Sequence, residues 1–314
     1  MIREPLEAPR DVAVVVAVVV AYQPEPNRFA RLLSALQPQV AAVIVVDNGA
    51  GIGLEDVRWD DRAQRVEMPG NAGVAAAQNA GIRRAVALAA SHVLLLDHDS
   101  VPAADMTAKL LAAASGQRAR GARVAAVGPA YDDPRHAGTS PFVTMGRTGF
   151  RRHSPEASEE AVPVAFLISA GSLIGVDAID AVGPMDERLF IDYIDVEWCL
   201  RARSLGWHCY GVPAAHMEHQ LGDAPLSWRN GSAALKIFGR TLPSRSPLRH
   251  YYLFRNGWWL ILRSRLPVRW KLLEAKRLFA CFGAYLAFAS PRGEQLRAMA
   301  RGAFDGVRGR LGPA

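Results

Sequence analysis

The sequence predicts an α/β fold with a mostly parallel, doubly wound sheet, followed by a helical, basic C-terminal region. Three segments, 12–22, 40–47 and 92–97, are nearly continuous runs of Val, Ala, Ile and Leu. Apolar runs without polar alternation are typical of strands that are covered on both faces, as in a parallel sheet. Two segments with helical spacing or high alanine content, 27–38 and 71–90, separate these runs. Strands and helices therefore alternate, as a doubly wound sheet requires.

The remaining elements follow from shorter patterns. In chain order we expect a strand at 122–131, an irregular polar loop at 131–160 and strand-like apolar sequence at 161–176. A short helix at 177–183, a longer helix at 195–206 and a short strand at 207–213 follow. Glycines end both helices. The segment GDAP then marks a change of composition, so we divide the chain into an α/β domain, residues 10–222, and a C-terminal region, residues 223–314.

The formal net charge of +7 has its source near the C-terminus. In residues 240–314, Lys and Arg far outnumber Asp and Glu, whereas residues 1–239 are net acidic. The basic region has no zinc-finger or RRM signature, and its arginines alternate with Leu, Phe and Trp, so we expect no nucleic acid partner. This mixture suits a surface that faces anionic lipid headgroups.

Disulfides and targeting segments are not expected. The three cysteines are scattered and form no CxxC pair, which fits a reducing cytoplasm. The first 11 residues lack the apolar core of a signal peptide. The apolar runs at 12–20 and 278–289 are shorter than the roughly 20 residues that span a bilayer. We therefore predict a cytoplasmic protein without a transmembrane helix.

Polar residues follow three of the predicted strands, at the point where each strand ends. These residues are Tyr22, Asp47 and Asp97. The carboxyl ends of parallel strands meet at one edge of the sheet, and ligands of such sheets bind there. We expect a nucleotide at this edge.

Asp97 and Asp99 are separated by a single histidine. Two carboxylates on one side of the chain repel each other unless a cation lies between them, and a hard divalent ion bridged to phosphate oxygens would supply that cation. Alternatively, both acids are solvated in a turn, and one caps the helix after Pro102. The spacing alone leaves both interpretations open.

Asp47 and Asn71 have similar pairs of interpretations. The Asp47 carboxylate would accept the imide N–H of a uracil or thymine ring, or it would begin an Asx turn. Asn71 precedes the Ala-rich helix, where small residues let a ligand approach the backbone, although helix capping alone would explain it.

Three acids, Asp192, Asp195 and Glu197, lie among bulky apolar residues in FIDYIDVEWCLRA. Their mutual repulsion would keep one carboxylate basic enough to accept a proton near neutral pH. Helix capping accounts for one or two of these acids but not for all three. In HMEHQLGD, bracketed by Pro213 and Gly222, we expect a loop in which His219 contacts a metal and His216 has no special role.

Seven motifs occur in one order: VVVAYQPE, VVDNGAG, NAGVAAAQNAG, LLLDHDS, SAGSLIG, FIDYIDVEWCLRARSLGW and HMEHQLGD. With this set the chain resembles the family 2 glycosyltransferases of GT-A fold, and among them the bacterial rhamnosyltransferases of O-antigen and related polysaccharide assembly. The resemblance covers about residues 12–260.

The resemblance implies roles residue by residue. Positions that bind the nucleotide are matched by Tyr22, Asp47, Asn71 and Asp97. The DxD motif and a histidine after the last strand, which hold Mg²⁺ or Mn²⁺, are matched by Asp97, Asp99 and His219. Asp195 matches the general base. The donor and acceptor pocket is assigned Gly171, Ser172, Asp192, Glu197 and Arg255, the last in an RN pair that would close over the diphosphate.

The activity that the resemblance implies is an inverting, metal-dependent transfer of L-rhamnose from dTDP-L-rhamnose to a hydroxyl of a lipid-linked saccharide. Transfer of another sugar, such as galactofuranose from a UDP donor, is an alternative. A sugar-1-phosphate nucleotidyltransferase would need a Gly-rich phosphate loop after the first strand, where AYQPEPNRF has none. An inactive assembly scaffold would not need Asp97, Asp99 and Asp195 to be intact, and all three are present.

The last predicted helix has an apolar side with Leu296, Met299, Ala303 and Val307 and a basic side with Arg297, Arg301 and Arg308. Such a helix would hold the protein reversibly at the inner face of the cytoplasmic membrane. Alternatively, it packs on its own domain or on a partner subunit of a homo-oligomer.

Overall fold

The structure is a computed structural model that describes residues 13–49, 54, 62–132, 139–146, 150–219, 236–237, 240–241, 245–288 and 290–314. The chain forms two compact units, Met1–Glu187 with Trp198–Gln220, and Arg188–Glu197 with Leu221–Ala314. The segment Arg188–Glu197 thus groups with the C-terminal helices, although it lies inside residues 10–222 of the domain division made from the sequence.

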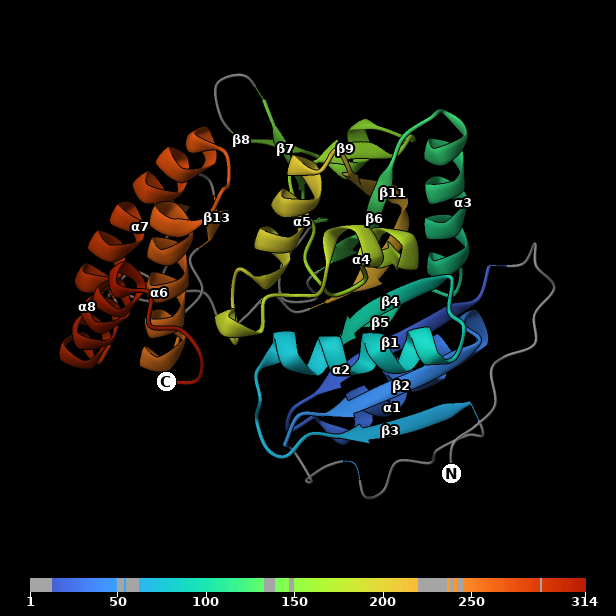
Figure 1. The fold of residues 1–314 in the computed structure, drawn as a ribbon, viewed down its shortest axis with the longest axis horizontal. Helices are drawn as coiled ribbons and strands as arrows, with labels where there is room; N and C mark the ends of the chain where they lie inside the picture. Colours follow the sequence, from blue (N-terminus) through green and yellow to red (C-terminus); the bar gives the residue numbers. More distant parts are fainter. Residues whose placement is uncertain are drawn as a thin grey trace. The chain divides into compact units, whose positions relative to one another are not determined.

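The first unit is built on a twisted sheet (Figure 1). Its strands run in the order β3-β2-β1-β4-β10-β6-β11-β5, and β9 also pairs with β11. The bounds are β1 Val15–Ala21, β2 Ala42–Asp47, β3 Ala63–Glu67, β4 His92–Asp97, β5 Val101–Pro102, β6 Val124–Asp132, β9 Val162–Val164, β10 Leu173–Gly175 and β11 His208–Glu218. The first four strands are mutually parallel, and β6 is parallel to β11. The predicted α/β fold is confirmed, but β10 enters antiparallel between β4 and β6.

Helices cover both faces of this sheet, which explains why the strands are continuously apolar. The helices of this unit are α1 Pro26–Leu36, α2 Val74–Ala87, α3 Met106–Ala119 and α4 Val176–Val182, with short 3₁₀ turns at Gln37–Gln39 and Pro155–Ala157. On one face, Phe29 and Leu32 of α1 join the core around Val19. On the other face, α2 approaches so closely that a Cβ at Gly81 would overlap the side chain of Val18.

Two predictions for this unit are wrong. The segment 131–160 was expected to be an irregular loop, but it contains an antiparallel hairpin of β7 Phe142–Met145 and β8 Phe150–His153. Phe142 is buried, because its ring packs over Gly211, where no Cβ would fit. The strand β11 continues past Pro213, because a register shift between Val212 and His216 accommodates the proline. His216 therefore lies in a strand and not in the expected loop.

The second unit consists mainly of three helices, α6 Pro247–Arg263, α7 Val268–Phe288 and α8 Arg292–Arg308. A 3₁₀ turn, Glu187–Leu189, and the helix α5, Ile194–Ser204, connect the units, and a two-stranded ladder joins β12 Lys236–Ile237 to β13 Arg240–Thr241. Gly302 and Gly306 of α8 lie against the backbone of Tyr251 and Arg255 in α6, where no Cβ would fit. In the part of the chain that the structure describes, we find no helix with the length and hydropathy of a membrane span.

Candidate active site

The ends of three strands meet at one edge of the sheet, as the sequence predicts. In the register of the parallel ladders, Ala21 pairs with Asp47, and Val20 pairs with Asp97. Tyr22 follows β1 directly, and 41% of its surface is exposed. The carboxyl edge of β1, β2 and β4 is therefore lined by an accessible aromatic ring and two carboxylates.

Asp97, Asp99 and His219 form a cluster at this edge. One potential ligand atom of each residue lies within 4.8 Å of the others. Asp97 ends β4 and Asp99 lies in the turn after it, so the turn, and not the alternation of a strand, directs the second carboxylate. Antiparallel pairing of β5 with the end of β11, Val101 opposite Glu218, places His219 beside this turn. The backbone N–H of His219 also donates to the carbonyl of Asp132 at 3.0 Å.

The charges in this cluster stabilise one another. The Nδ1 atom of His219 is 3.4 Å from Oδ1 of Asp99 and 3.0 Å from the hydroxyl of Ser100. Burial opposes the charged form of Asp99, but the hydrogen bond and positive charge of His219 outweigh it, so the pKa of Asp99 is lowered. Burial likewise opposes protonation of His219, yet the hydrogen bond with Asp99 and the charges of Asp97 and Asp99 raise its pKa. The raised pKa favours the imidazolium form of His219, whose positive charge offsets part of the charge of the two acids.

The donor atoms of this cluster fit a divalent cation. Two carboxylates and one imidazole provide oxygen and nitrogen ligands, a set that Mn²⁺ and Mg²⁺ accept. The side chain of His219 is almost completely buried, at 8% exposure, and a buried histidine beside two acids is well placed to complete such a set. Deprotonation of the imidazole would free its nitrogen for the metal.

A second polar group holds the loops after β2 and before α2 together. The amide of Asn48 donates to Oδ1 of Asn71 at 3.2 Å and accepts from the N–H of Ala72 at 3.0 Å. Gly49, at φ +83°, allows this approach, because a Cβ there would lie 2.6 Å from the nitrogen of Asn71. Oδ1 of Asn71 also accepts from the N–H of Gly73 at 3.1 Å. Gly73 is itself the N-cap of α2 and no side chain caps the helix, so Asn71 forms a turn before the helix and is not its cap.

Asp47 is buried at the end of β2 and pairs with an arginine. Nη2 of Arg65, on the neighbouring β3, lies 2.5 Å from Oδ2 of Asp47. A carboxylate has about four acceptor sites, so it can accept from more than one donor.

Gly171 and Ser172 form the turn that leads into β10. Gly171 has φ +82°, and a Cβ there would lie 2.6 Å from the ring of Pro129. The N–H of Gly171 donates to the carbonyl of Leu95 at 2.8 Å, and the N–H of Leu95 donates to the carbonyl of Ser172 at 2.9 Å. The Ser172 hydroxyl donates to the carbonyl of Ile168 at 2.6 Å. This turn is fastened directly to the strand that carries Asp97.

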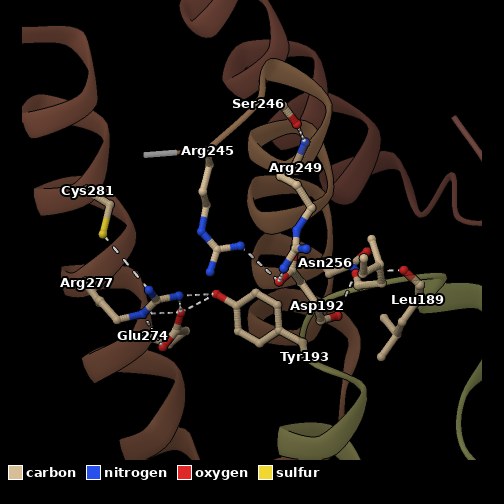
Figure 2. A network of polar contacts seen from close by, with 11 residues as sticks. Leu189, Asp192, Tyr193, Arg245, Ser246, Arg249, Asn256, Glu274, Arg277 and Cys281 are labelled. Carbon is tan, nitrogen blue, oxygen red and sulfur yellow. Dashed lines mark hydrogen bonds and ion pairs between the residues drawn. The ribbon is translucent and has the colours of Figure 1, made fainter. Parts of the chain in front are cut away.

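The three acids of FIDYIDVEW belong to the second unit and have different environments there. Asp195 lies in the first turn of α5, where its carboxylate accepts from the N–H of Val196 at 2.8 Å. Glu197 is buried in the same turn. Asp192 is paired with Arg245 and Arg249 (Figure 2). Burial opposes the charge of Asp192, but both guanidinium groups outweigh it and lower its pKa. The expected repulsion therefore does not raise the pKa of Asp192.

Arg255 and His216 also differ from expectation. Arg255 is fully buried, and its guanidinium donates to the carbonyls of Arg188, Leu189 and Gly312. These contacts favour a structural role for Arg255 over closure upon a diphosphate. His216 lies 3.6 Å from the carboxylate of Asp132 with 47% of its side chain exposed.

Comparisons with known proteins agree with this geometry. Residues 9–233 match the family model described as glycosyltransferase like family 2. The chain belongs to this family. It is 30% identical over 301 residues to a protein of Shigella flexneri called dTDP-rhamnosyl transferase RfbF, covering 94% of this chain and 96% of that one. It is 27% identical over 292 residues to the N-acetylglucosaminyl-diphospho-decaprenol L-rhamnosyltransferase of Mycobacterium tuberculosis, covering 83% and 89%.

Solved structures give the same fold for this glycosyltransferase. TarS 1–349 of S. aureus, in complex with UDP-GlcNAc, superimposes with a TM-score of 0.54 at 14% identity, covering 94% of this chain and 81% of that one. GalNAc-T7 with UDP, GalNAc and Mn²⁺ superimposes with a TM-score of 0.58 at 14% identity, covering 80% of this chain and 49% of that one. This chain thus matches about half the length of the GalNAc-T7 structure.

Sequence reasoning missed two groups of site residues in this glycosyltransferase. Asn48 donates to the side chain of Asn71, and Arg65 donates to that of Asp47. These contacts depend on how the loops meet and on the pairing of β2 with β3, which the sequence does not show. Asn256 and the pair Arg245 and Arg249 hold the segment before Asp195. The RN pair was a signal for Asn256, whereas no motif pointed to Arg245 or Arg249.

Proposed function

We propose that this glycosyltransferase transfers L-rhamnose from dTDP-L-rhamnose, with inversion, to a hydroxyl of a lipid-linked saccharide. The names of the Shigella and Mycobacterium relatives support the sugar. The observation that carries the proposal is the cluster of Asp97, Asp99 and His219 beside the strand ends with Tyr22 and Asp47. A nucleoside diphosphate needs a divalent cation next to a base site, and the residue types at this edge fit both.

The donor would bind across this edge. The ring of Tyr22 would stack on the base, and the carboxylate of Asp47 would accept the imide N–H of thymine. Asn71 keeps the adjoining loop in place. When bound to Asp97, Asp99 and His219, Mg²⁺ or Mn²⁺ would neutralise charge on the leaving diphosphate. The turn Gly171–Ser172 would line the pocket for the donor sugar.

Asp195 would act as the general base. Its carboxylate removes the proton from the acceptor hydroxyl while that oxygen bonds to the anomeric carbon, and the bond from this carbon to the diphosphate oxygen breaks. Attack from the face opposite the diphosphate inverts the configuration, and dTDP leaves with the bonding electrons. The resemblance assigns this role to Asp195, which is half-buried in the first turn of α5.

A donor panel tests the proposal. Purified protein with Mn²⁺ or Mg²⁺ is assayed for binding and hydrolysis of dTDP-L-rhamnose, UDP-galactofuranose, UDP-glucose and UDP-GlcNAc. We expect dTDP-L-rhamnose to bind most tightly and only with metal present. Preference for UDP-galactofuranose would replace the rhamnose assignment, although the comparisons do not favour that alternative. Equal binding with and without metal would remove the metal from the proposal.

The acceptor would be presented at an anionic membrane surface on the cytoplasmic side. Part of the apolar side predicted for the last helix serves internal packing, since Met299 is fully buried against the other helices. Leu296 and Val307, however, are exposed, as is Phe304, beside the exposed Arg297. These residues would give a peripheral contact, while the close packing of α8 on α6 supports the alternative role within the second unit. The homo-oligomer suggested as an alternative would be tested separately, by measuring the oligomeric state.

A further inference from the structure

The segment before α5 has an unusual backbone. Phe190, Asp192 and Tyr193 have φ values of +64°, +63° and +66°. Residues with a Cβ rarely adopt this left-handed conformation, and it persists only where surrounding contacts hold it. Asp195 follows in the first turn of the helix. The contacts that hold this backbone therefore lie directly before the residue proposed as general base.

The carboxylate of Asp192 is the first of these contacts. Nη1 of Arg245 lies 3.1 Å from its Oδ1. Arg249 donates from Nε to Oδ2 at 3.0 Å and from Nη2 to Oδ1 at 2.9 Å, so the contact is bidentate. The Asp192 side chain is only 11% exposed. Figure 2 shows both guanidinium groups converging on this one carboxylate.

The main chain of the segment is held by an amide. Nδ2 of Asn256, a fully buried residue of α6, donates to the carbonyls of Leu189 and Ile191 at 2.8 Å and of Asp192 at 3.0 Å. The side-chain oxygen of Asn256 accepts from Nε of Arg255 at 2.9 Å. The two N–H groups of this amide thus serve three carbonyls within four residues, one N–H being shared, and they hold the path of the chain into α5.

Tyr193 supplies the third contact, with α7. Its hydroxyl donates to Glu274 and accepts from Nη2 of Arg277 at 2.6 Å. Arg277 also pairs with Glu274 at 2.5 Å, so the hydroxyl ends in a closed, charged network (Figure 2). The backbone carbonyl of Tyr193 accepts from the N–H of Glu197 at 2.8 Å and starts the helix. A residue that begins α5 is therefore anchored to α7.

We propose that Asp192 and Asn256, with Tyr193, are positioning residues: through them the C-terminal helices set the orientation of the Asp195 carboxylate. The proposal rests on the role of Asp195 as general base. It gives the basic C-terminal region a part in the transfer reaction that does not depend on membrane contact. The positive charges of Arg245 and Arg249 serve the active site by holding an acid that itself takes no proton.

The test compares Asp192→Asn with Asp305→Asn. Asp305 is a matched control, since it is also a buried acid of the second unit that contacts two arginines, Arg301 and Arg310, but it has no contact with Arg188–Glu197 among the described interactions. We expect Asp192→Asn to lower kcat for dTDP-L-rhamnose by about 10- to 100-fold with KM for the donor nearly unchanged, because misplacement by about 1 Å is sufficient. Asp305→Asn should destabilise the protein without lowering kcat.

Hydrogen exchange provides a readout that does not require activity. The amides of 194–198 should exchange faster in Asp192→Asn than in the wild type, and they should be unchanged in Asp305→Asn. Tyr193→Phe, which removes one hydroxyl and keeps the ring, should show the same changes to a smaller degree. Unchanged exchange in Asp192→Asn and Tyr193→Phe would overturn the positioning role. Equal kcat losses in Asp192→Asn and Asp305→Asn would also overturn it.

A double variant separates this proposal from the proposed base. In an Asp195→Asn background, Asp192→Asn should lower kcat little further, because its effect passes through Asp195. Full additivity would mean that Asp192 acts by another route. Full activity of Asp195→Asn alone would instead refute the base assignment, and the positioning role in catalysis with it, whatever the exchange data show.

Discussion

Asp97 and Asp99 of the first unit turn towards His219 and bring three donor atoms to one place, whereas Asp192 of the second unit is enclosed by two guanidinium groups. Arginine cannot give up its charge, so the second cluster is neutralised permanently. An imidazole can give up its proton and become a ligand, so the first cluster can exchange a proton for a metal. Acids with similar sequence settings thus have a proposed binding role in the first unit and structural ion pairs in the second.

Asp195, which lies in neither cluster, should show the largest effect. Asp195→Asn should reduce kcat by about 10²- to 10⁴-fold while donor affinity stays nearly constant, because the variant loses only proton transfer. Steady-state kinetics and calorimetry with dTDP-L-rhamnose measure the two quantities. As a control, Asp105→Asn changes an exposed acid beside Lys109 and should leave both unchanged. A large fall in donor affinity would place Asp195 in the binding site instead.

Substitution of Asp192, the acid paired with Arg245 and Arg249, should change the stability of the protein. Asp192→Asn should lower the free energy of unfolding at pH 7 by about 1.5–3 kcal/mol, since it removes a charged hydrogen-bond partner of Arg245 and Arg249. The pKa of Asp192 is below its ordinary 3.8, so its contribution is present above about pH 3.8 and is lost as the pH falls through the folded-state pKa.

Urea unfolding at pH 7, 5 and 3 checks this sign. The difference between wild type and Asp192→Asn should be the same at pH 7 and 5 and should shrink at pH 3. A difference that grows on acidification would mean that Asp192 is protonated in the folded protein at neutral pH.

Substitutions in the cluster of Asp97, Asp99 and His219 should instead change the metal-dependent affinity for the donor. Asp99→Ala should weaken donor affinity in the presence of Mn²⁺ by about 10- to 100-fold and have little effect on the weaker binding without metal. Calorimetry with dTDP-L-rhamnose, with and without Mn²⁺, measures both. His216→Ala is the control for His219→Ala, since His216 lies outside the cluster. Equal losses for the two histidine variants would argue against a metal ligand at His219.

Membrane contact should show the smallest effect. Arg297→Gln and Phe304→Ser should each weaken binding to vesicles with anionic phosphatidylglycerol about fivefold, or about 1 kcal/mol per residue. Val86→Ser, which changes a similarly exposed apolar residue of the first unit, should have no effect. Vesicle flotation provides the measurement. If all three variants float like the wild type, α8 serves packing alone.

The features that could be predicted from the sequence are those that depend on interactions between residues close together in the chain. Runs such as 92–97 were recognised because a strand covered on both faces needs only apolar side chains, a local property. Asp97 and Asp99 were found because they follow such a run. The three-residue strand β10 has no periodicity of its own, and its antiparallel entry depends on β4 and β6, which lie far away in the sequence. The roles of Asn256 and Arg65 were not predicted for the same reason, because they depend on partners on other elements.

The turn that joins Gly171 and Ser172 to Leu95 has a consequence for engineering. Two backbone hydrogen bonds tie this turn to β4 at a point two residues before Asp97. A segment proposed to touch the sugars is thus mechanically coupled to the strand that ends in the proposed cation ligands. Loops exchanged between relatives to alter acceptor choice should keep residues 170–173 intact, since a shift there would also displace the carboxylate of Asp97.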